Sequence, residues 1–223
     1  MKMRFKSFIK RSLPSIILLL LVASTLATGF VYAKYVKTHS YSAPLTVDAY
    51  GQMDIALCQG GNVATPWEGY SFKLVPGKAI GFDPYLYLAA NNENGYIFIK
   101  VEESIKAALE FSDYIQYGIR TDAGWTKGDG TNIPANVYWI YVESSVNDRY
   151  YGIIHNNAAT PVNNQVLVPD TVTEAKMAAL GGNAPTLTLT AYSCHSVNLS
   201  GTANTAAQAA LAWAEVNTLY NTP

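Results

Sequence analysis

The stretch GYIFIKVEES, residues 95–104, limits the choice of fold more than any other part of this chain. Its residues alternate between two sides of an extended strand, because successive side chains of a strand point to opposite faces. One side holds Ile97, Ile99 and Val101, and the other holds Tyr96, Phe98, Lys100 and Glu102. The purely aliphatic side predicts a strand whose Ile97 face lies in a hydrophobic core.

Similar strand signals recur along the chain, with turn-forming residues between them. Further strands are expected at residues 45–57 (broken near Gly51), 70–75, 79–92, 114–120, 136–144, 149–154, 165–169 and 186–199. Residues 58–69 and 121–134 are expected to be loops. Capping and helical spacing predict a short helix at 171–182 and a C-terminal helix at 202–220. The pattern predicts an all-β chain, an antiparallel β-sandwich with short connecting helices and a C-terminal helix.

Composition and charge agree with strands and argue against nucleic acid as a partner. The chain has 16 tyrosines and 16 glycines, and only 14% of its residues are charged. Of its 15 basic residues, five lie in residues 1–33, a segment without acids, so the remainder has 10 basic against 16 acidic residues. An acidic chain without basic clusters lacks the lysines and arginines that bind phosphates.

The N-terminus has the organisation of an export signal. A basic segment, residues 1–12, precedes an uncharged apolar segment that ends in Val31-Tyr32-Ala33, an acceptable signal-peptidase site. Cleavage after Ala33 would make Lys34 the new N-terminus. The alternative is an uncleaved transmembrane helix over residues 13–33, because about 20 apolar residues span a bilayer. In both cases the basic start places residues 34–223 outside the cytoplasm.

Several motifs resemble the TasA/camelysin family of secreted proteins from Gram-positive bacteria. The signal ending Ala27-Thr28-Gly29-Phe30-Val31-Tyr32-Ala33-Lys34-Tyr35 is similar to signals that the peptidase SipW cuts. The core pattern Leu74-Val75-Pro76-Gly77, then Asp83-Pro84, then the strand Tyr96–Val101, also resembles the family. So do the Gly124-Trp125-Thr126-Lys127 loop and the final long strand. The resemblance covers nearly all of residues 29–200.

The resemblance implies a structural protein rather than an enzyme, with a jelly-roll form of the β-sandwich and no cofactor. Such a chain would be secreted into the extracellular matrix or kept at the cell surface, and would form fibres of biofilm-matrix type. Its subunits would join head to tail by donor-strand exchange, in which the N-terminal arm of one copy completes the sheet of the next. The implied partners are further copies of this chain, the peptidase SipW, and other matrix proteins or cell-wall glycans.

Three segments follow from these inferences. Residues 1–33 are the signal peptide, residues 34–47 are the assembly arm, and residues 48–223 are the sandwich domain with its C-terminal helix. The arm is polar but able to form a strand, with Tyr35, Val36, Tyr41, Leu45 and Val47 as its apolar positions. The C-terminal helix has an apolar face formed by Ala206, Ala209, Ala210, Trp213, Val216 and Tyr220. This face would pack on its own domain or on a neighbouring subunit.

Catalytic and metal-binding motifs are weak in this sequence. The camelysin resemblance raises a metalloprotease as a lesser alternative, but there is no H-E-x-x-H motif, and His39, His155 and His195 are far apart in sequence. Asp122, Asp129 and Asp148 belong to no calcium-loop pattern and are expected to be turn carboxylates. Cys58 and Cys194 would either form a disulfide in an exported protein or remain as two buried free thiols.

A second function class rests on the aromatic residues. Tyr85, Tyr87, Trp139, Tyr141, Tyr150 and Tyr151 could form an exposed strip that stacks on sugar rings, or they could pack inside the sheets. The strip would make the protein a monomeric module that binds glycans or other components of the cell envelope.

Overall fold

The computed structural model describes residues 37–41, 47–51, 53–66, 75–91, 93–103, 110–156, 159–173, 175–176, 186–195 and 204–220, with the backbone alone for 37–51. These residues all belong to one compact unit, Lys37–Pro223. Within them the structure consists mostly of β-strands in antiparallel sheets, with a single long helix at the C-terminal end, as the sequence predicts.

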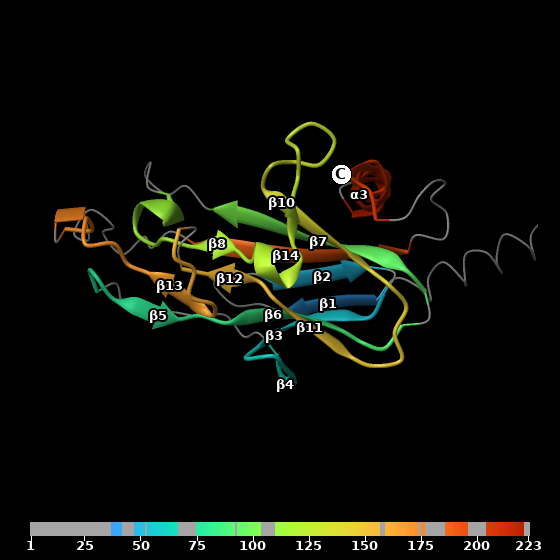
Figure 1. Cartoon of the computed structure of the whole chain (residues 1–223), viewed down its shortest axis with the longest axis horizontal. Coiled ribbons are helices and arrows are strands. Elements are labelled where there is room, and N and C mark those ends of the chain that lie inside the picture. Colours follow the sequence, from blue (N-terminus) through green and yellow to red (C-terminus); the bar gives the residue numbers. More distant parts are fainter. Residues whose placement is uncertain are drawn as a thin grey trace, which may run out of the picture. The chain divides into compact units, whose positions relative to one another are not determined.

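The larger sheet, sheet A, has six strands in the order β1-β2-β14-β7-β10-β9 (Figure 1). Their bounds are β1 (Lys37–Tyr41), β2 (Val47–Gly51), β14 (Leu187–His195), β7 (Gly95–Glu103), β10 (Val137–Val142) and β9 (Thr126–Lys127). Neighbouring strands are antiparallel except β2 and β14, which are parallel. The parallel pair attaches the β1–β2 hairpin to the long strand near the end of the chain.

The second sheet, sheet B, has four strands in the order β11-β6-β3-β4. These are β11 (Arg149–Gly152), β6 (Pro84–Leu88), β3 (Ile55–Gln59) and β4 (Asn62–Pro66). Two small antiparallel pairs join β12 (Ile154–His155) to β8 (Gly118–Ile119), and β13 (Gln165–Leu167) to β5 (Ala79–Gly81). Two 3₁₀ turns, η1 (Phe111–Asp113) and η2 (Thr121–Ala123), lie in the connections.

The main hydrophobic core lies between the two sheets. Sheet B contributes Leu57 and Leu86, and sheet A contributes Ile97, Ile99 and Leu189, all almost completely buried. The expectation that Ile97, Ile99 and Val101 face the core is therefore confirmed. Burial of these side chains is the dominant favourable contribution to folding, at roughly 1.5–3 kcal/mol for each large aliphatic residue.

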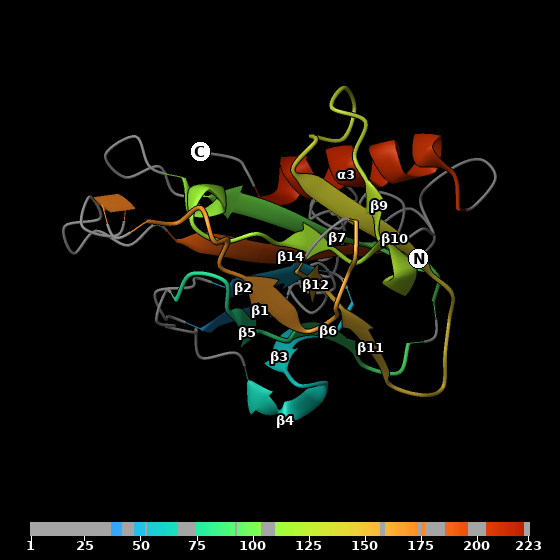
Figure 2. The ribbon, with the colours of Figure 1, turned by 60° about the vertical axis from the view of Figure 1, so that its left-hand side comes forward.

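A second core lies on the opposite face of sheet A, under α3 (Ala206–Tyr220), the red helix in Figure 2. There Tyr96, Phe98 and Trp139 of the sheet pack with Trp213 of the helix. Strand β7 is thus buried on both faces, where the sequence indicated one. The apolar helix face is confirmed at Ala209, Trp213 and Val216, but Ala206 is exposed. The helix packs on its own domain, one of the two alternatives.

Several expected elements differ in extent from those observed. The predicted loop 58–69 contains the end of β3 and all of β4, because Gly60 and Gly61 both adopt positive φ and turn the chain into a hairpin. The strand expected at 79–92 divides into β5 and β6, and the one at 114–120 shortens to β8 after η1. The strand expected at 70–75 lies almost wholly outside the described residues, as does most of the short helix at 171–182.

Two backbone positions of β4, on the edge of sheet B, offer no free N–H donor. The Ala64 N–H donates to the Asn62 Oδ1 at 3.0 Å, and β4 ends at Pro66, which has no N–H. The Thr65 hydroxyl also donates back to the Gln59 carbonyl oxygen at 3.0 Å. This arrangement disfavours the addition of another strand at this edge.

Candidate functional site

The expected assembly arm lies partly in the described residues and forms an edge of sheet A. Tyr41 ends β1 and Val47 begins β2, and the two are directly opposite each other in the antiparallel hairpin. Ala33, Lys34, Tyr35, Val36 and Leu45 lie outside the described residues, so the cleavage site and these arm positions stay predictions. Among the strands that the structure describes, β1 is the last on its side of sheet A.

The hairpin is an addition to the rim of the sheet rather than part of its centre. β2 pairs in parallel with β14, with Val47 opposite Leu189 and Gly51 opposite Ser193. The body of the domain begins just after it, at the buried Met53, whose N–H donates to the Ser193 Oγ at 3.0 Å. The Ser193 hydroxyl in turn donates to the Met53 carbonyl oxygen at 3.3 Å. These two bonds anchor the chain where it enters the core.

The two cysteines form no disulfide with each other. Cys58 lies on β3 in sheet B, whereas Cys194 lies on β14 in sheet A and faces α3, so sheet A and the main core separate them. Both are buried free thiols, which corrects the disulfide alternative. Sequence spacing could not decide this, because it does not indicate which sheet each strand joins. Burial raises the pKa of Cys58 from 9.0 to about 11 and that of Cys194 to about 12.

We expect both thiols to be unreactive in the folded protein and reactive after unfolding. The thiolate is the attacking species, and the raised pKa values leave very little thiolate at neutral pH. Because both folded pKa values exceed the unfolded value of 9.0, the stabilisation from neutral thiols is complete below pH 9 and is lost as the pH rises toward 11 and 12. A chromogenic thiol reagent, with and without urea, tests this. Rapid labelling of folded protein would contradict it.

The three histidines lie on separate elements. His39 is in β1, the buried His155 is in β12, and the Nδ1 of His195 in β14 lies 3.3 Å from the Glu93 Oε2. No group of three or more His, Cys, Asp or Glu side chains suited to a metal ion occurs among the residues that the structure describes. The metalloprotease alternative thus gains no support from this part of the chain.

The three aspartates considered for calcium accept hydrogen bonds or form an ion pair within the protein. Asp129 Oδ1 accepts the backbone N–H groups of Thr131, Asn132 and Ile133, which lowers the pKa of the Asp129 carboxyl. Asp122 pairs with Arg120 at 3.0 Å, and Asp148 Oδ1 accepts the Ala90 N–H. All three therefore hold loops in place.

The expected aromatic strip divides among three environments. Trp139 and Tyr141 pack in the second core, on the face of sheet A that α3 covers. Tyr151 turns toward the main core, with its ring 6.3 Å from that of Trp125. Tyr85, Tyr87 and Tyr150 remain together on the outer face of sheet B. A continuous six-residue strip was therefore wrong, and a three-residue group is what the structure shows.

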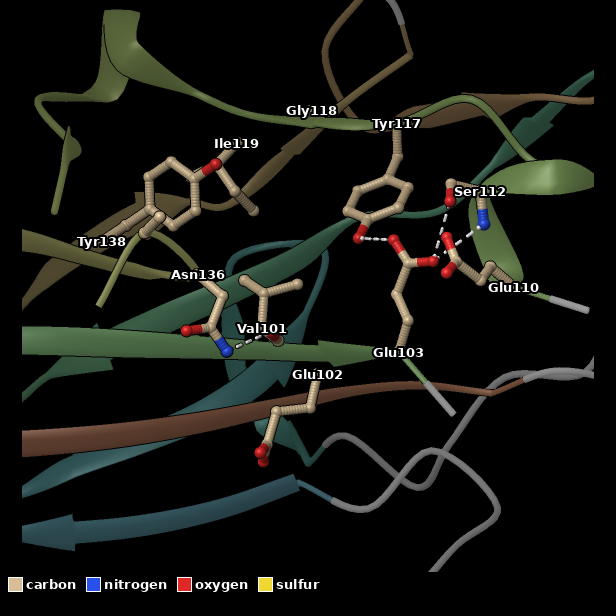
Figure 3. A pocket seen from close by; sticks show the side chains of 11 residues that line it. Val101, Glu102, Glu103, Glu110, Ser112, Tyr117, Gly118, Ile119, Asn136 and Tyr138 are labelled. Carbon is tan, nitrogen blue, oxygen red and sulfur yellow. Dashed lines mark hydrogen bonds between the residues drawn. The ribbon is translucent and has the colours of Figure 1, made fainter. Parts of the chain in front are cut away.

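An open pocket of about 620 Å³ lies beside the end of β7 (Figure 3). Glu103 lies at its centre: its Oε1 accepts the Tyr117 hydroxyl at 2.6 Å, and its Oε2 accepts the Ser112 N–H and hydroxyl. Burial, followed by the bond to Glu103, raises the pKa of Tyr117, which keeps the phenol protonated. The charged residues recorded in the lining are Glu102, Glu103 and Glu110.

Sequence reasoning missed this pocket because its lining comes from separate segments. Glu103 ends β7, Ser112 lies in η1, and Asn136 and Tyr138 precede and enter β10. The Asn136 amide is occupied as well, since its Nδ2 donates to the Val101 carbonyl oxygen at 3.0 Å. In Figure 3 the Glu102 side chain points away from Glu103 and Glu110. The internal bonds of Glu103 and Asn136 make these groups structural supports of the strand ends.

Comparisons with protein-family models, with curated protein sequences and with solved structures gave no significant match. In the part of the chain that is described, no helix is long and apolar enough to cross a bilayer.

Proposed function

We propose that the protein is an exported structural subunit that polymerises into extracellular or cell-surface fibres by donor-strand exchange. The observation that carries the proposal is the position of the β1–β2 hairpin. It follows the expected cleavage site directly, lies at the rim of sheet A and joins the domain through the β2–β14 pair. A hairpin at the rim of a sheet can leave its own sheet and occupy the equivalent position in another copy. It then forms the same backbone hydrogen bonds there.

Exchange of this kind produces a chain of subunits. When the hairpin of one copy occupies the rim of the next, the donor's own rim along β14 is open to a third copy. A head-to-tail contact of this type does not close on itself and therefore gives filaments. The Met53–Ser193 bonds mark the boundary of the exchanging segment, because the chain before them contacts the rim and the chain after them enters the core.

The proposal includes the processing and location inferred from the sequence. A SipW-type peptidase would cut after Ala33, freeing the arm at Lys34 outside the cytoplasm. The sandwich would be of the jelly-roll type, as in the TasA/camelysin family. The main partner would be further copies of this chain, with other matrix proteins or cell-wall glycans around the fibre.

Deletion of residues 34–44 should abolish filament formation. The deletion removes all of β1, so β2 loses its hairpin partner and the exchanged segment is reduced to a single strand. Negative-stain microscopy and light scattering of the secreted protein would show filaments for the full arm and dispersed subunits for the deletion. Filaments of unchanged abundance from the shortened chain would overturn the proposal.

A reversible cross-link separates exchange from simple stacking of subunits. Ala49 and Ala191 are register partners in the β2–β14 pair, so Ala49→Cys with Ala191→Cys places two thiols on adjacent strands. Oxidation of assembled material should give a ladder of covalent oligomers on a non-reducing gel. An internal cross-link within single chains of the filament would contradict exchange. The matched control is Ala49→Cys alone, which should give neither product.

A further inference from the structure

The outer face of sheet B carries a group of tyrosines, which we call the tyrosine face: Tyr85, Tyr87 and Tyr150. Tyr85 and Tyr87 alternate along β6 with Leu86 and Leu88, which point into the main core. The two tyrosines therefore point outward. Tyr150 on β11 is directly opposite Tyr87, their ring centroids are 5.2 Å apart, and Tyr150 is 39% exposed.

The Tyr85 ring is held by a hydrogen bond at its hydroxyl group, and the Tyr87 ring by its contact with the Tyr150 ring. Burial and then the Asp148 carboxylate raise the pKa of the Tyr87 hydroxyl, and Asp148 Oδ1 itself accepts the Ala90 N–H at 3.0 Å. The Tyr85 hydroxyl accepts a hydrogen bond from the Asn164 amide at 3.1 Å. A ring that is fixed before binding loses little conformational freedom when a ligand covers it, which favours affinity.

Gly152 leaves space for polar side chains at the edge of the tyrosine face, which we call the polar border. It lies opposite Tyr85 in the β6–β11 pair, and a Cβ at this position would meet the Arg120 guanidinium. The absence of a side chain thus leaves room for Arg120 beside Tyr85. Arg120 pairs with Asp122, and Asn163 donates to the same Asp122 carboxylate at 3.2 Å. This border offers amide, guanidinium and carboxylate groups next to the ring surfaces.

The charges around the Tyr87–Tyr150 pair are negative. Burial is the largest cause of the raised pKa of the Tyr87 hydroxyl, and the negative charges of Asp148 and Asp54 raise it further. Arg149 is next to Tyr150 in sequence, but it lies opposite Leu88 in the sheet. The Cβ of Arg149 therefore points to the core-facing side of sheet B. The half-buried Tyr87 ring, which contacts the exposed Tyr150 ring, therefore lies near two carboxylates. Aromatic faces and carboxylates both attract ammonium groups.

We propose that the tyrosine face binds a polysaccharide that carries free amino groups. A sugar ring presents a flat C–H face that can stack on Tyr150, with hydroxyl groups at its edge for the polar border. The ammonium group of an amino sugar would lie against the Tyr87–Tyr150 pair, next to Asp148 and Asp54. This binding site lies on sheet B, away from the rim of sheet A that the assembly proposal uses, so the two proposals are independent.

The test is a titration of the folded full-length chain with three oligosaccharides of equal length. These are a glucosamine oligomer, an N-acetylglucosamine oligomer and a β-1,4-glucose oligomer, followed by calorimetry or by NMR. We expect the glucosamine oligomer to bind roughly tenfold more tightly than the other two, and added salt to weaken that preference. Equal binding of all three, or no binding of any, would overturn the proposal.

Variants assign the binding to the tyrosine face. Tyr150→Ala should lower the affinity for the glucosamine oligomer roughly tenfold, and Tyr150→Phe should retain it, because the ring is kept. Val146→Ala is the matched control, since Val146 is 87% exposed and lies near the start of β11. Unchanged binding by Tyr150→Ala would overturn the proposal. A lysine-rich peptide is the last probe: if it binds as tightly as the glucosamine oligomer, the sugar ring contributes nothing and the proposal fails.

Discussion

Replacement of Trp213 by alanine should lower the free energy of unfolding by about 3–5 kcal/mol. Trp213 is only 5% exposed, and its ring packs 5.2 Å from that of Phe98 and 5.7 Å from that of Tyr192, both in sheet A. The substitution removes the largest side chain that joins α3 to the sheet and leaves a cavity between them. Urea denaturation followed by circular dichroism would measure the change as a lower transition midpoint.

The matched control is Leu211→Ala on the same helix. Leu211 is 50% exposed and lies outside the second core, so its replacement should change stability by about 0.5 kcal/mol or less. Both residues are large and apolar, and the two substitutions keep the helix propensity of the site high. Equal effects of the two substitutions would mean that α3 does not pack on sheet A through Trp213.

Replacement of Gly95 by alanine should lower the free energy of unfolding by about 1–3 kcal/mol. A Cβ on Gly95 would lie 2.6 Å from the Cys194 carbonyl oxygen and 2.8 Å from the Met53 Cε. The first contact is with the backbone of β14, which cannot move without displacing the longest strand pair of sheet A. Thermal or urea unfolding of the purified variant would measure the loss.

Gly81→Ala is the control for this prediction. Gly81 lies in β5, and a Cβ there would meet no atom within 4 Å. Alanine should be tolerated at this position with a change of about 0.5 kcal/mol or less. If Gly81→Ala were as destabilising as Gly95→Ala, the close approach of Gly95 to β14 would not explain the loss of stability.

Local periodicity predicted the strands of the main core well, because their side chains alternate. The aliphatic face of β7 and the outward turn of Tyr85 and Tyr87 both follow from a period of two. The second core could not be predicted in the same way. Tyr96 and Phe98 look like the outer face of a half-buried strand, and only the tertiary packing of α3 covers them.

The candidate sites show the same limit. The sequence indicated a strand-competent arm at residues 34–47 and a strand at 45–57. β1 lies in the first and β2 in the second, but local sequence holds no information on the pairing of β2 with β14. The sequence analysis placed six aromatic residues in one strip, whereas only three of them share the outer face of sheet B. The pocket around Glu103 depends on Ser112 and Tyr117, whose convergence on one carboxylate arises from tertiary structure.

The β4 edge lowers the number of places where a neighbour can join a subunit through its sheets. With the Ala64 N–H occupied by Asn62 and with Pro66 at the end of the strand, that edge offers poor bonding positions to another chain. Fewer bonding positions mean a lower valence for each subunit. Particles of low valence grow into unbranched lines, whereas those of high valence form networks and gels. At high concentration, this edge should therefore favour threads over branched aggregates.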